Sequence, residues 1–289
     1  PKDSLLIYYL KAFDTVWHDG LRKMLFEANI PEKILRLISN FLDNRQGQVK
    51  VNQNMSMKVP LTAGVPQGSI LSPLLYIFFI RQLPTKISNE VMSSFYADDI
   101  CYSASDNTHK RRSCFAATHL QEILNELTIF CQKWRIKLNP DKTVVLNSYI
   151  TKENNNTPRL WLGGELLKYE KSCKFLGVTF DSNHTFKEHI DDIVKRAKKR
   201  LNLLKALRGQ SWGASPETIL YSYRTYLRPL LEYSCILFTY ASDDLLRKIQ
   251  AVETQAIKIA FRLAPWDTNK SCYNLVTFEN ILKRMKKLS

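Results

Sequence analysis

Two adjacent acidic residues, Asp98 and Asp99, stand between two apolar stretches of the chain. The flanking residues, Met92 to Phe95 and Ile100 to Tyr102, have the composition of β-strands. Two strands this close together need a tight turn, so Tyr96-Ala97-Asp98-Asp99 is expected to form a hairpin with both acids at its tip. The chain therefore contains a β-sheet, and the surrounding sequence must supply its other strands and helices.

Strand and helix patterns alternate on both sides of this hairpin. Short apolar runs predict strands over residues 5–10, 48–51, 57–61, 144–146 and 175–180. Apolar residues at helical spacing predict helices near residues 21–26, from Pro31 to residue 42, over 70–80 and over 118–134. The polar Asn52-Gln53-Asn54 segment is expected to be a turn. This mixture indicates an α+β fold.

The last third of the chain has an almost purely helical pattern. Thr185 and Glu188 have the spacing of a capping box, and Gly209 suits a helix end, so one long helix is predicted between them. Further helices are predicted over residues 215–227 and 243–261. We therefore place a boundary near residues 181–185 and predict two domains, 1–182 and 183–289. The expected fold class is α+β, an antiparallel sheet with packing helices followed by a mostly helical domain.

The chain is strongly basic, with 42 Lys and Arg against 27 Asp and Glu and a formal net charge of +15. A positive field of this size favours nucleic acid as partner, with a membrane surface as the competing candidate. No apolar stretch is long enough to span a bilayer and no signal peptide is recognisable, so we expect no membrane partner and an intracellular location, in the nucleus or the cytoplasm. The six cysteines lack zinc-ligand spacing, so reduced thiols are expected.

The two carboxylates at the predicted hairpin tip offer hard oxygen ligands of the kind that Mg²⁺ prefers. Enzymes of phosphoryl transfer often hold two metal ions ~3.5 to 4 Å apart, which activate the attacking oxygen and stabilise the leaving oxygen. Paired acids at a turn are also common as simple solvated groups. The hairpin by itself fits both interpretations.

A second stretch helps to interpret the hairpin. It reads Ala63-Gly64-Val65-Pro66-Gln67-Gly68-Ser69-Ile70-Leu71-Ser72-Pro73-Leu74. It resembles the B motif of reverse transcriptases from non-LTR (LINE-type, Jockey-like) retrotransposons, and its order and spacing relative to Asp98 match that family. Pro66 and Gly68 would then shape a turn that a nucleotide can approach closely, and Gln67 would offer its amide to sugar or base edges. Without the resemblance, Pro-Gln-Gly would be an ordinary turn before a helix.

Further stretches resemble motifs of the same family. Lys11-Ala12-Phe13-Asp14-Thr15-Val16 is similar to the end of the A motif, in which Phe13 would be the steric gate against a ribose 2′-hydroxyl. A lone Phe would otherwise be assigned to the core. Trp134 to Thr143 is similar to the D region, which implies that Lys142 lies near the triphosphate. Phe175-Leu176-Gly177 resembles the primer-grip turn, and Tyr226 to Tyr233 resembles a segment of the thumb.

The resemblance covers nearly the whole chain and implies a right-hand polymerase palm over residues 1–182 and a helical thumb over residues 183–289. The implied activity is that of an RNA-directed DNA polymerase, which uses two-metal nucleotidyl transfer. Its implied partners are an RNA template, the RNA–DNA hybrid and dNTP, with Mg²⁺ as cofactor. Asp98 and Asp99 would bind the metal, and they would act in catalysis together with Lys142.

The predicted thumb helix carries a basic run without an intervening acid: Lys195, Arg196, Lys198, Lys199, Arg200, Lys205 and Arg208. We select Lys195, Arg196 and Lys199 as candidates for contacts with the backbone of the hybrid. The alternative is an ordinary solvated helix face. Backbone binding is preferred because the apolar face of the helix is accounted for separately and the whole chain is basic.

One position departs from the family pattern. The A motif places a metal-binding Asp three residues before the Lys of Lys-Ala-Phe-Asp, and Tyr8 stands there in this chain. A phenol titrates near ~10 and is neutral at pH 7, so it cannot replace a carboxylate ligand. The two-metal site is therefore expected to be incomplete. Ile77, where the family usually has Asn, is a lesser departure.

The chain also begins inside the predicted palm, so we expect a truncated fragment whose fingers are missing. The first hypothesis is a reverse transcriptase domain in a copy that is impaired by Tyr8. The second hypothesis is a non-catalytic remnant of a transposon that binds nucleic acid and transfers no nucleotide.

Overall fold

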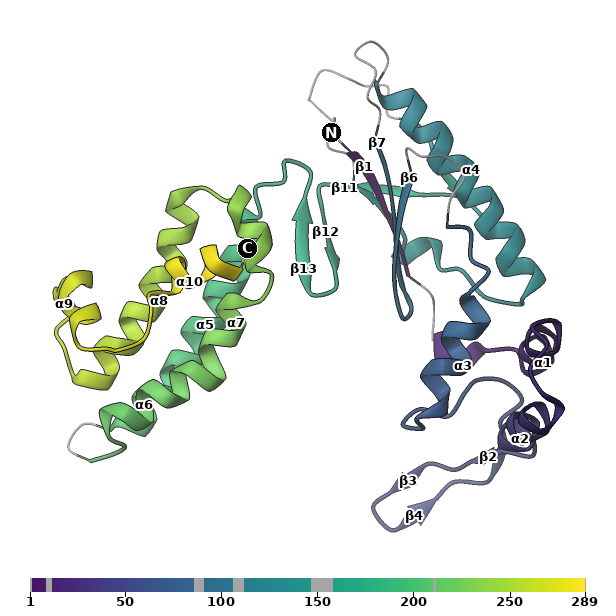
Figure 1. Cartoon of the computed structure of the whole chain (residues 1–289), viewed down its shortest axis with the longest axis horizontal. Coiled ribbons are helices and arrows are strands. Elements are labelled where there is room, and N and C mark those ends of the chain that lie inside the picture. Colours follow the sequence, from purple (N-terminus) through teal and green to yellow (C-terminus); the bar gives the residue numbers. More distant parts are fainter. Residues whose placement is uncertain are drawn as a thin grey trace. The chain divides into compact units, whose positions relative to one another are not determined.

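The structure, a computed structural model, describes residues 2–8, 12–85, 91–105, 112–146, 158–209 and 212–288. Lys11 of the A-motif stretch lies outside these residues. The chain divides into two compact units, Pro1–Lys171 and Ser172–Ser289, called here the first and second unit (Figure 1). The division falls earlier than the boundary predicted after residue 182, because the hairpin over residues 172–181 packs on the helix that follows it.

A five-stranded sheet lies at the centre of the first unit, in the order β11-β8-β1-β7-β6. Its strands are β1 (Lys2–Tyr8), β6 (Val91–Tyr96), β7 (Asp99–Ser105), β8 (Val144–Leu146) and β11 (Lys168–Glu170). The neighbours from β8 to β6 pair antiparallel, as predicted. The edge strand β11 pairs with β8 in parallel. The strands expected over residues 5–10 and 144–146 are thus present as β1, which begins earlier, and β8.

A long helix, α4 (Arg112–Lys133), packs on β7 and β1 (Figure 1). Alternate residues of β7 are fully buried, which is the pattern of a strand with one face on the core: Ile100, Tyr102 and Ala104. The buried residues of α4 recur at helical spacing: Leu120, Ile123, Leu124 and Leu127. The β6–β7 hairpin therefore stands on a well-packed base.

The segment over residues 12–80 adds helices and a second hairpin. The helical elements are η1 (Ala12–Thr15), α1 (His18–Glu27), α2 (Glu32–Leu42) and α3 (Leu71–Ile80), close to the predicted positions. Between α2 and α3, two short ladders form the hairpin, β2 (Gln46–Gly47) with β5 (Val59–Pro60) and β3 (Lys50–Val51) with β4 (Asn54–Met55). A hairpin is thus present where a strand pair was predicted over residues 48–51 and 57–61, but its ladders also use residues 46–47 and 54–55, outside those ranges.

Three short elements complete the first unit. The 3₁₀ turn η2 (Pro140–Lys142) precedes β8, and β9 (Trp161–Leu162) pairs with β10 (Glu165–Leu166). The side chain of Gln121 on α4 holds this small ladder, because its amide accepts from the Trp161 backbone N–H at 2.8 Å and donates to the Trp161 carbonyl at 2.9 Å.

The second unit begins with a hairpin of β12 (Ser172–Phe175) and β13 (Val178–Asp181). The prediction of one strand over residues 175–180 is wrong. Leu176 and Gly177 both have positive φ, 48° and 79°, and reverse the chain in a two-residue turn. The helical elements that follow are α5 (Lys187–Arg208), α6 (Pro216–Ser222), the π-helical turn η3 (Tyr223–Leu227), α7 (Arg228–Glu232), η4 (Cys235–Tyr240), α8 (Asp243–Phe261), α9 (Asn269–Asn274) and α10 (Ile281–Leu288).

The long helix predicted after Thr185 is present as α5, but its capping box is not formed. The N-cap residue is Phe186, which has a left-handed backbone and makes no capping bond with its side chain. The Thr185 hydroxyl accepts the backbone N–H of Lys187 at 3.3 Å, and Asp181, the last residue of β13, binds the two residues before the helix. Its carboxylate accepts the backbone N–H groups of Thr185 at 3.0 Å and Phe186 at 2.6 Å. Asp181 thereby ties the hairpin to the start of α5.

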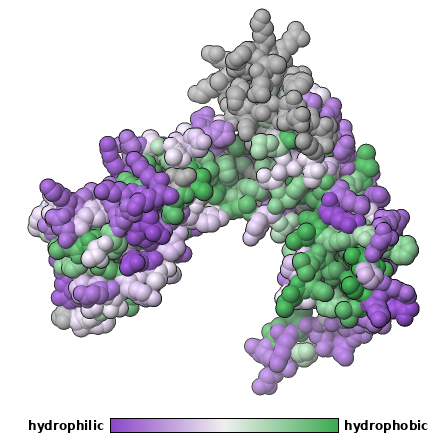
Figure 2. Space-filling model, viewed as in Figure 1, coloured by the Kyte–Doolittle hydropathy of each residue, from purple (hydrophilic) through white to green (hydrophobic). Residues whose placement is uncertain are grey.

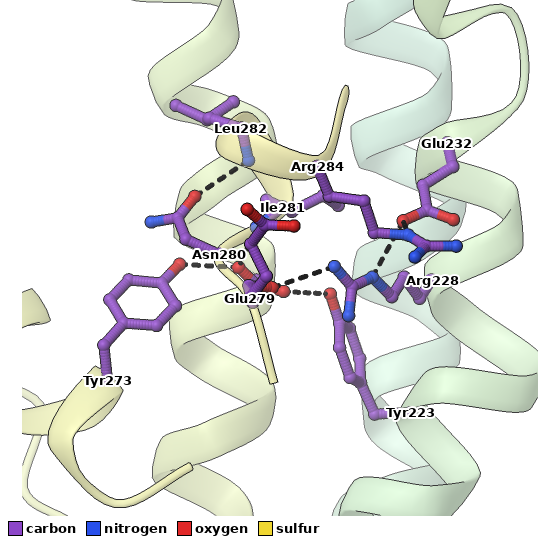
Figure 3. Close-up of polar contacts among 10 residues, drawn as sticks. Tyr223, Arg228, Glu232, Tyr273, Glu279, Asn280, Ile281, Leu282 and Arg284 are labelled. Atoms are coloured by element: carbon purple, nitrogen blue, oxygen red, sulfur yellow. Dashed lines mark hydrogen bonds and ion pairs between the residues drawn. The ribbon is translucent and has the colours of Figure 1, made fainter. Parts of the chain in front are cut away.

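A buried carboxylate joins the helices of the second unit, and Figure 3 labels its partners Tyr223, Tyr273 and Ile281. Glu253 on α8 is 0% exposed, and burial raises its pKa. It accepts hydrogen bonds from the hydroxyls of Tyr223 at 2.9 Å and Tyr273 at 2.6 Å, and from the backbone N–H of Ile281 at 2.8 Å. A buried carboxylate is tolerated only with such partners, so Glu253 links η3, α9 and α10 to α8.

Beside Glu253, a buried arginine continues the polar network (Figure 3). Arg228 pairs with Glu232 at 2.8 Å and donates to the carbonyl oxygen of Glu279 at 2.9 Å. Arg284 on α10 reaches the same Glu232 carboxylate at 2.6 Å. The Arg228–Pro229 stretch that resembles the thumb motif therefore holds the C-terminal helix in place.

The predicted α+β fold class is confirmed, with a sheet and packing helices in the first unit and mostly helices in the second. Within the described part of the chain, none of the helices combines the length and the apolar character that crossing a bilayer requires. Among the described residues, five cysteines are not joined in disulfide bonds: Cys101, Cys131, Cys173, Cys235 and Cys272.

Candidate functional site

The hairpin predicted around Asp98 and Asp99 is present. β6 ends at Tyr96 and β7 begins at Asp99, so Ala97 and Asp98 are the two turn residues, and Ala97 has the left-handed φ of 53° that such turns use. Both carboxylates are half-buried. Burial, and then the negative charge of Asp98, raise the pKa of Asp99. Two mutually repelling carboxylates at one tip form a site that a cation would stabilise.

The register of the sheet puts Tyr8 directly opposite Asp99. In the β1–β7 pairing, Tyr8 is the partner of Asp99, and in the β6–β7 pairing Tyr96 is its partner on the other side. Asp99 therefore lies between the last residues of β1 and β6. Position 8, where the family pattern expects a metal-binding Asp, is adjacent to the acidic tip.

Phe13 and the acidic tip are connected through Tyr76. The ring of Phe13, on η1, stacks on the ring of Tyr76, on α3, with 4.5 Å between centroids and 28° between planes. Burial, and then the negative charge of Asp98, raise the pKa of the Tyr76 phenol. The predicted steric gate is thus half-buried against an aromatic residue that lies within electrostatic reach of Asp98. Both interpretations of Phe13, gate and core, are compatible with this position.

The predicted nucleotide-binding turn contains Gln67 and Gly68, which are both exposed. The side-chain amide of Gln67 donates to a carboxylate oxygen of Asp14 at 3.1 Å. Gly68 has a φ of +88°, and a Cβ atom built on it would meet nothing within 4 Å. The backbone at Gly68 is therefore open to the approach of another molecule, while Gln67 links this turn to η1.

Gly64 and His18 are structural residues of this site that sequence reasoning did not single out. Gly64 has a φ of +87°, and a Cβ atom there would lie 2.8 Å from the backbone of Asp14. Its N–H donates to the carbonyl of Val16 at 2.9 Å, and its carbonyl bonds the Nε2 atom of His18 at 2.8 Å. The glycine in the quoted motif was a usable signal for this close approach. Nothing in one sequence marks His18.

Lys142 lies at the end of η2, two residues before β8, and is exposed. In the β1–β8 pairing, Val144 is opposite Leu6, near the end of β1 that carries Tyr8. Lys142 therefore lies at the same end of the sheet as the acidic tip. Its neighbour Asp141 forms a surface ion pair with Lys168 at 3.4 Å.

A hydrophobic area covers α3 on the face shown in Figure 2. Its exposed apolar residues are Ile70 (92% exposed), Leu74 (65%) and Ile77 (59%). Ile77 is the position where the family pattern expects Asn. An apolar side chain with this exposure adds nothing to the stability of the unit, so the departure at Ile77 concerns the surface of α3 and not its packing.

In the second unit, the predicted primer-grip turn is the tip of the β12–β13 hairpin. Phe175 ends β12, and Leu176 and Gly177 are the turn residues. The hydroxyl of Tyr233 donates to the Leu176 carbonyl oxygen, and its ring lies 3.4 Å from where a Cβ atom of Gly177 would be. Two stretches that resemble family motifs, 175–177 and 226–233, are thus brought together.

The basic run on α5 separates into two groups. The arginines are engaged within the second unit: Arg196 pairs with Asp192 at 3.0 Å, Arg200 donates to the Tyr226 carbonyl at 2.6 Å, and Arg208 donates to the Ala260 carbonyl at 2.9 Å. The lysines are exposed and line a groove of about 820 Å³ between α5 and α8. This lysine groove contains Lys195, Lys198, Lys199, Lys205 and Lys248, and it is also lined by Asp191, which forms an ion pair with Lys248 at 2.5 Å. Of the three predicted contacts, Lys195 and Lys199 therefore face the groove, and Arg196 is held in an ion pair.

The acidic hairpin and the turn around Gly68 lie in the first unit, and the lysine groove lies in the second. The family described as reverse transcriptase (RNA-dependent DNA polymerase) matches residues 9–180 of the chain. The chain belongs to this family, and the resemblance inferred from its motifs is confirmed.

Particular relatives come from retrotransposons. The chain is 30% identical over 271 residues to the RNA-directed DNA polymerase from mobile element jockey of Drosophila melanogaster, and 29% identical over 262 residues to the probable RNA-directed DNA polymerase from transposon BS of the same organism. Each match covers 89% of this chain and 28% of the relative, so the chain spans little more than a quarter of these proteins. A telomerase structure from Candida albicans, in complex with a fragment of telomeric RNA, is 16% identical, with a TM-score of 0.44 over 99% of this chain and 49% of the telomerase.

Proposed function

We propose that the chain is the polymerase domain of a retrotransposon RNA-directed DNA polymerase, and that this copy is impaired because Tyr8 replaces a metal-binding carboxylate. The observation that supports the impairment is the direct pairing of Tyr8 with Asp99. Directly paired positions are the nearest neighbours across two antiparallel strands, with Cβ atoms roughly 4.5 to 5.5 Å apart. Position 8 is therefore where a third carboxylate would join Asp98 and Asp99.

The family reaction, two-metal nucleotidyl transfer, does not fit the donor set of this chain. Mg²⁺ binds proteins through one or two carboxylates and keeps several waters, so Asp98 and Asp99 fit a single ion. Within the described residues, however, no group of three or more His, Cys, Asp or Glu side chains could hold a metal. The residues present do not complete a two-metal site, which is the physical reason for the proposed impairment.

The residues around the acidic tip are assigned to the incoming dNTP. Phe13 stacks on Tyr76, and a flat ring fixed in this way would leave no room for a ribose 2′-hydroxyl. Gly68 is open to approach, and the neighbouring Gln67 offers an amide to sugar or base edges. Lys142 is exposed at the same end of the sheet, where its ammonium group would attract the triphosphate.

The second unit is assigned to the RNA template and the RNA–DNA hybrid. Lys195 and Lys199 belong to the lysine groove, whose charge complements a phosphate backbone. The turn of Phe175, Leu176 and Gly177 is assigned to the primer strand, and the bond from Tyr233 fixes its backbone. With these proposed partners, the proposed location is inside the cell, in the nucleus or the cytoplasm.

Primer extension on an RNA template with Mg²⁺ and dNTPs tests the proposed function. The unchanged chain is compared with Tyr8→Asp, and a double variant of Tyr8→Asp with Asp99→Asn is the matched control. We expect Tyr8→Asp to extend the primer at least about 100-fold faster than the unchanged chain, which equals about 2.7 kcal/mol of activation free energy, and the double variant to lose this gain. Rapid extension by the unchanged chain, with no gain from Tyr8→Asp, would contradict the impairment.

A second candidate function, a nucleic-acid-binding remnant without catalysis, is favoured by the lysine groove. It predicts that neither the unchanged chain nor Tyr8→Asp extends a primer, while both bind an RNA–DNA hybrid with a steep dependence on salt. Replacing Lys195 and Lys199 by Gln should then lower the slope of log affinity against log salt by about 1 for each phosphate contact. Gln at Lys33 and Lys50, two exposed lysines of the first unit, is the matched control.

A further inference from the structure

Two of the five tryptophans of the chain are almost fully exposed at one end of the second unit. Trp212 follows α5 and is 71% exposed, and Trp266 follows α8 and is 83% exposed. The helices α5 and α8 lie side by side (Figure 1), and both their C-terminal ends are at this end of the unit, because Arg208 near the end of α5 bonds the carbonyl of Ala260 near the end of α8. Exposed indoles are unusual, since tryptophan is among the most buried residues on average.

Local contacts fix the backbone beneath both indoles. The ring of Trp212 lies against Gly209, where a Cβ atom would come within 3.2 Å of the indole. Trp266 stands in a turn that Asp267 closes by accepting the Ala264 N–H at 2.7 Å. The ammonium of Lys258 adds a hydrogen bond to the Pro265 carbonyl at 2.6 Å. The two rings are therefore exposed to solvent beside segments that make these local contacts.

A basic groove of about 820 Å³ lies between the segments that carry the two indoles. This end groove is lined by residues between Lys205 and Gly209, at the end of α5, and between Gln255 and Pro265, in the last turns of α8 and the segment after it. None of the described residues that line it is acidic. Four of them are cationic: Lys205, Arg208, Lys258 and Arg262. Each helix C-terminus contributes a partial charge of only about −0.5, so four cations outweigh the two helix ends. The end groove is thus a site for an anion.

The end groove is continuous with the lysine groove. Lys205 and Gln255 line both, so a chain of phosphates along α5 could extend from one into the other. Regular phosphates with flat apolar groups between them are the chemistry of a nucleic-acid strand. Its bases are available for stacking on indoles only when they are unpaired. A duplex hides its base faces, and so it would not use the two tryptophans.

We propose that Trp212, Trp266 and the end groove form a binding site for single-stranded nucleic acid, in addition to the surface assigned to the RNA–DNA hybrid. The exposed Lys205 and Arg262 bind phosphates, and the indoles stack on unpaired bases. Arg208 and Lys258 add positive charge to the groove while they remain bonded to the carbonyl oxygens of Ala260 and Pro265. The site involves no nucleotide transfer and does not depend on Asp98, Asp99 or Tyr8. It is therefore independent of whether this copy is active.

Fluorescence anisotropy with labelled oligonucleotides tests the site. The probes are single-stranded oligo(U) and oligo(dT) and an RNA–DNA hybrid of equal length, and the variants are Trp212→Ala and Trp266→Ala. Base stacking predicts that each change weakens single-strand binding by about 5-fold to 150-fold and changes hybrid binding by less than about twofold. The Phe variants, which keep a flat ring, should recover much of the affinity. Trp161→Ala, a change at a partly exposed tryptophan of the first unit, is the matched control.

Other outcomes would overturn the site. Equal losses for hybrid and single strand would show that the indoles do not read unpaired bases. Unchanged single-strand affinity in both Trp variants, confirmed as folded by circular dichroism, would confine binding to the lysine groove. Sedimentation with phosphatidylcholine–phosphatidylserine vesicles tests whether a lipid surface binds this end of the unit instead. Tryptophan-dependent binding to vesicles, without tryptophan-dependent binding to oligonucleotides, would assign this end of the unit to a lipid surface.

Discussion

Phe13 and Tyr76 form a stacked pair, with 4.5 Å between their ring centroids, although 62 positions separate them in the sequence. Tyr76 is 3% exposed and belongs to the core of the first unit, whereas Phe13 is only half-buried. The position of the predicted steric gate thus depends on the residue beneath it. Burial, and then the charge of Asp98, raise the pKa of the Tyr76 phenol, so the residue that stacks on Phe13 also lies within electrostatic reach of the acidic tip.

Removing the Tyr76 ring should destabilise the first unit. We expect Tyr76→Ala to lower the free energy of unfolding by about 3 to 5 kcal/mol, because it leaves a cavity under Phe13. Tyr76→Phe keeps the ring and should cost less than about 1.5 kcal/mol. Urea unfolding followed by circular dichroism measures both changes. Equal midpoints for Tyr76→Ala and the unchanged chain would disprove the supporting role.

Two glycines of the same segment should respond differently to alanine. Gly64 and Gly68 have nearly equal φ values, +87° and +88°, so Ala at either site carries a similar backbone cost of about 1 to 2 kcal/mol. At Gly64 the added Cβ also meets the Asp14 backbone at 2.8 Å, whereas at Gly68 it meets nothing within 4 Å. Gly64→Ala should therefore lower the free energy of unfolding more than Gly68→Ala, by a further ~1 to 3 kcal/mol. Matched midpoints in urea would contradict this ranking.

Strong local patterns predicted much of the fold. The helix expected over residues 243–261 is found with those bounds as α8, because its apolar stripe and its starting Asp residues are local signals. The acidic hairpin could also be predicted from the sequence, because two apolar stretches so close together can be joined only by a tight turn. The motif order then indicated the family, which composition and periodicity by themselves do not.

Contacts between distant segments were not predictable in this way. The bond between His18 and Gly64 joins residues 46 positions apart and leaves no periodic trace. Before α5, the carboxylate of Asp181 accepts the backbone N–H groups of Thr185 and Phe186. The β12–β13 hairpin brings this carboxylate to the start of the helix, so the spacing of Thr185 and Glu188 did not reveal it. The division of the basic run was hidden for a similar reason: its arginines look like its lysines in the sequence, yet Arg200 and Arg208 bond carbonyl oxygens of the unit, while the lysines line the groove.

The buried Glu253 should give the second unit a characteristic pH dependence. Burial raises its pKa above the ordinary value of 4.5, so the folded chain holds this proton more tightly than the unfolded chain. The stability from this protonation is fully present below pH 4.5 and is lost as the pH rises through the raised pKa. Gln at position 253 does not titrate, but it cannot accept all the hydrogen bonds that Tyr223, Tyr273 and Ile281 donate to Glu253. Glu253→Gln should therefore lower the free energy of unfolding by about 1 to 3 kcal/mol.

The unchanged chain should have a higher free energy of unfolding than Glu253→Gln, and this difference should become smaller as the pH rises above 4.5. Urea unfolding across a pH series measures it, and Glu188→Gln, at an exposed carboxylate of α5, is the matched control. A gap that stays constant or widens with pH would show that Glu253 does not take up a proton in this range.

His189 should produce the opposite pH dependence. Its Nδ1 atom accepts the backbone N–H of Thr179 at 3.3 Å, so this nitrogen carries no proton, and its Nε2 atom bonds the Ser234 hydroxyl at 2.8 Å. Burial, followed by the positive charge of Arg196, lowers the pKa of His189 from 6.5. Its contribution to stability is therefore present above pH 6.5 and is lost as the pH falls through the lowered pKa.

Protonating Nδ1 would set its N–H against that of Thr179, so the link from β13 to His189 should break in acid. We expect the unchanged chain to lose more stability than His189→Gln when the pH falls from about 7.5 to about 5, with His184→Gln, at an exposed histidine, behaving like the unchanged chain. Urea midpoints at both pH values give the comparison, and the NMR titration of the His189 ring protons gives the pKa directly. An identical acid response in His189→Gln would assign the pH dependence to other groups of the unit.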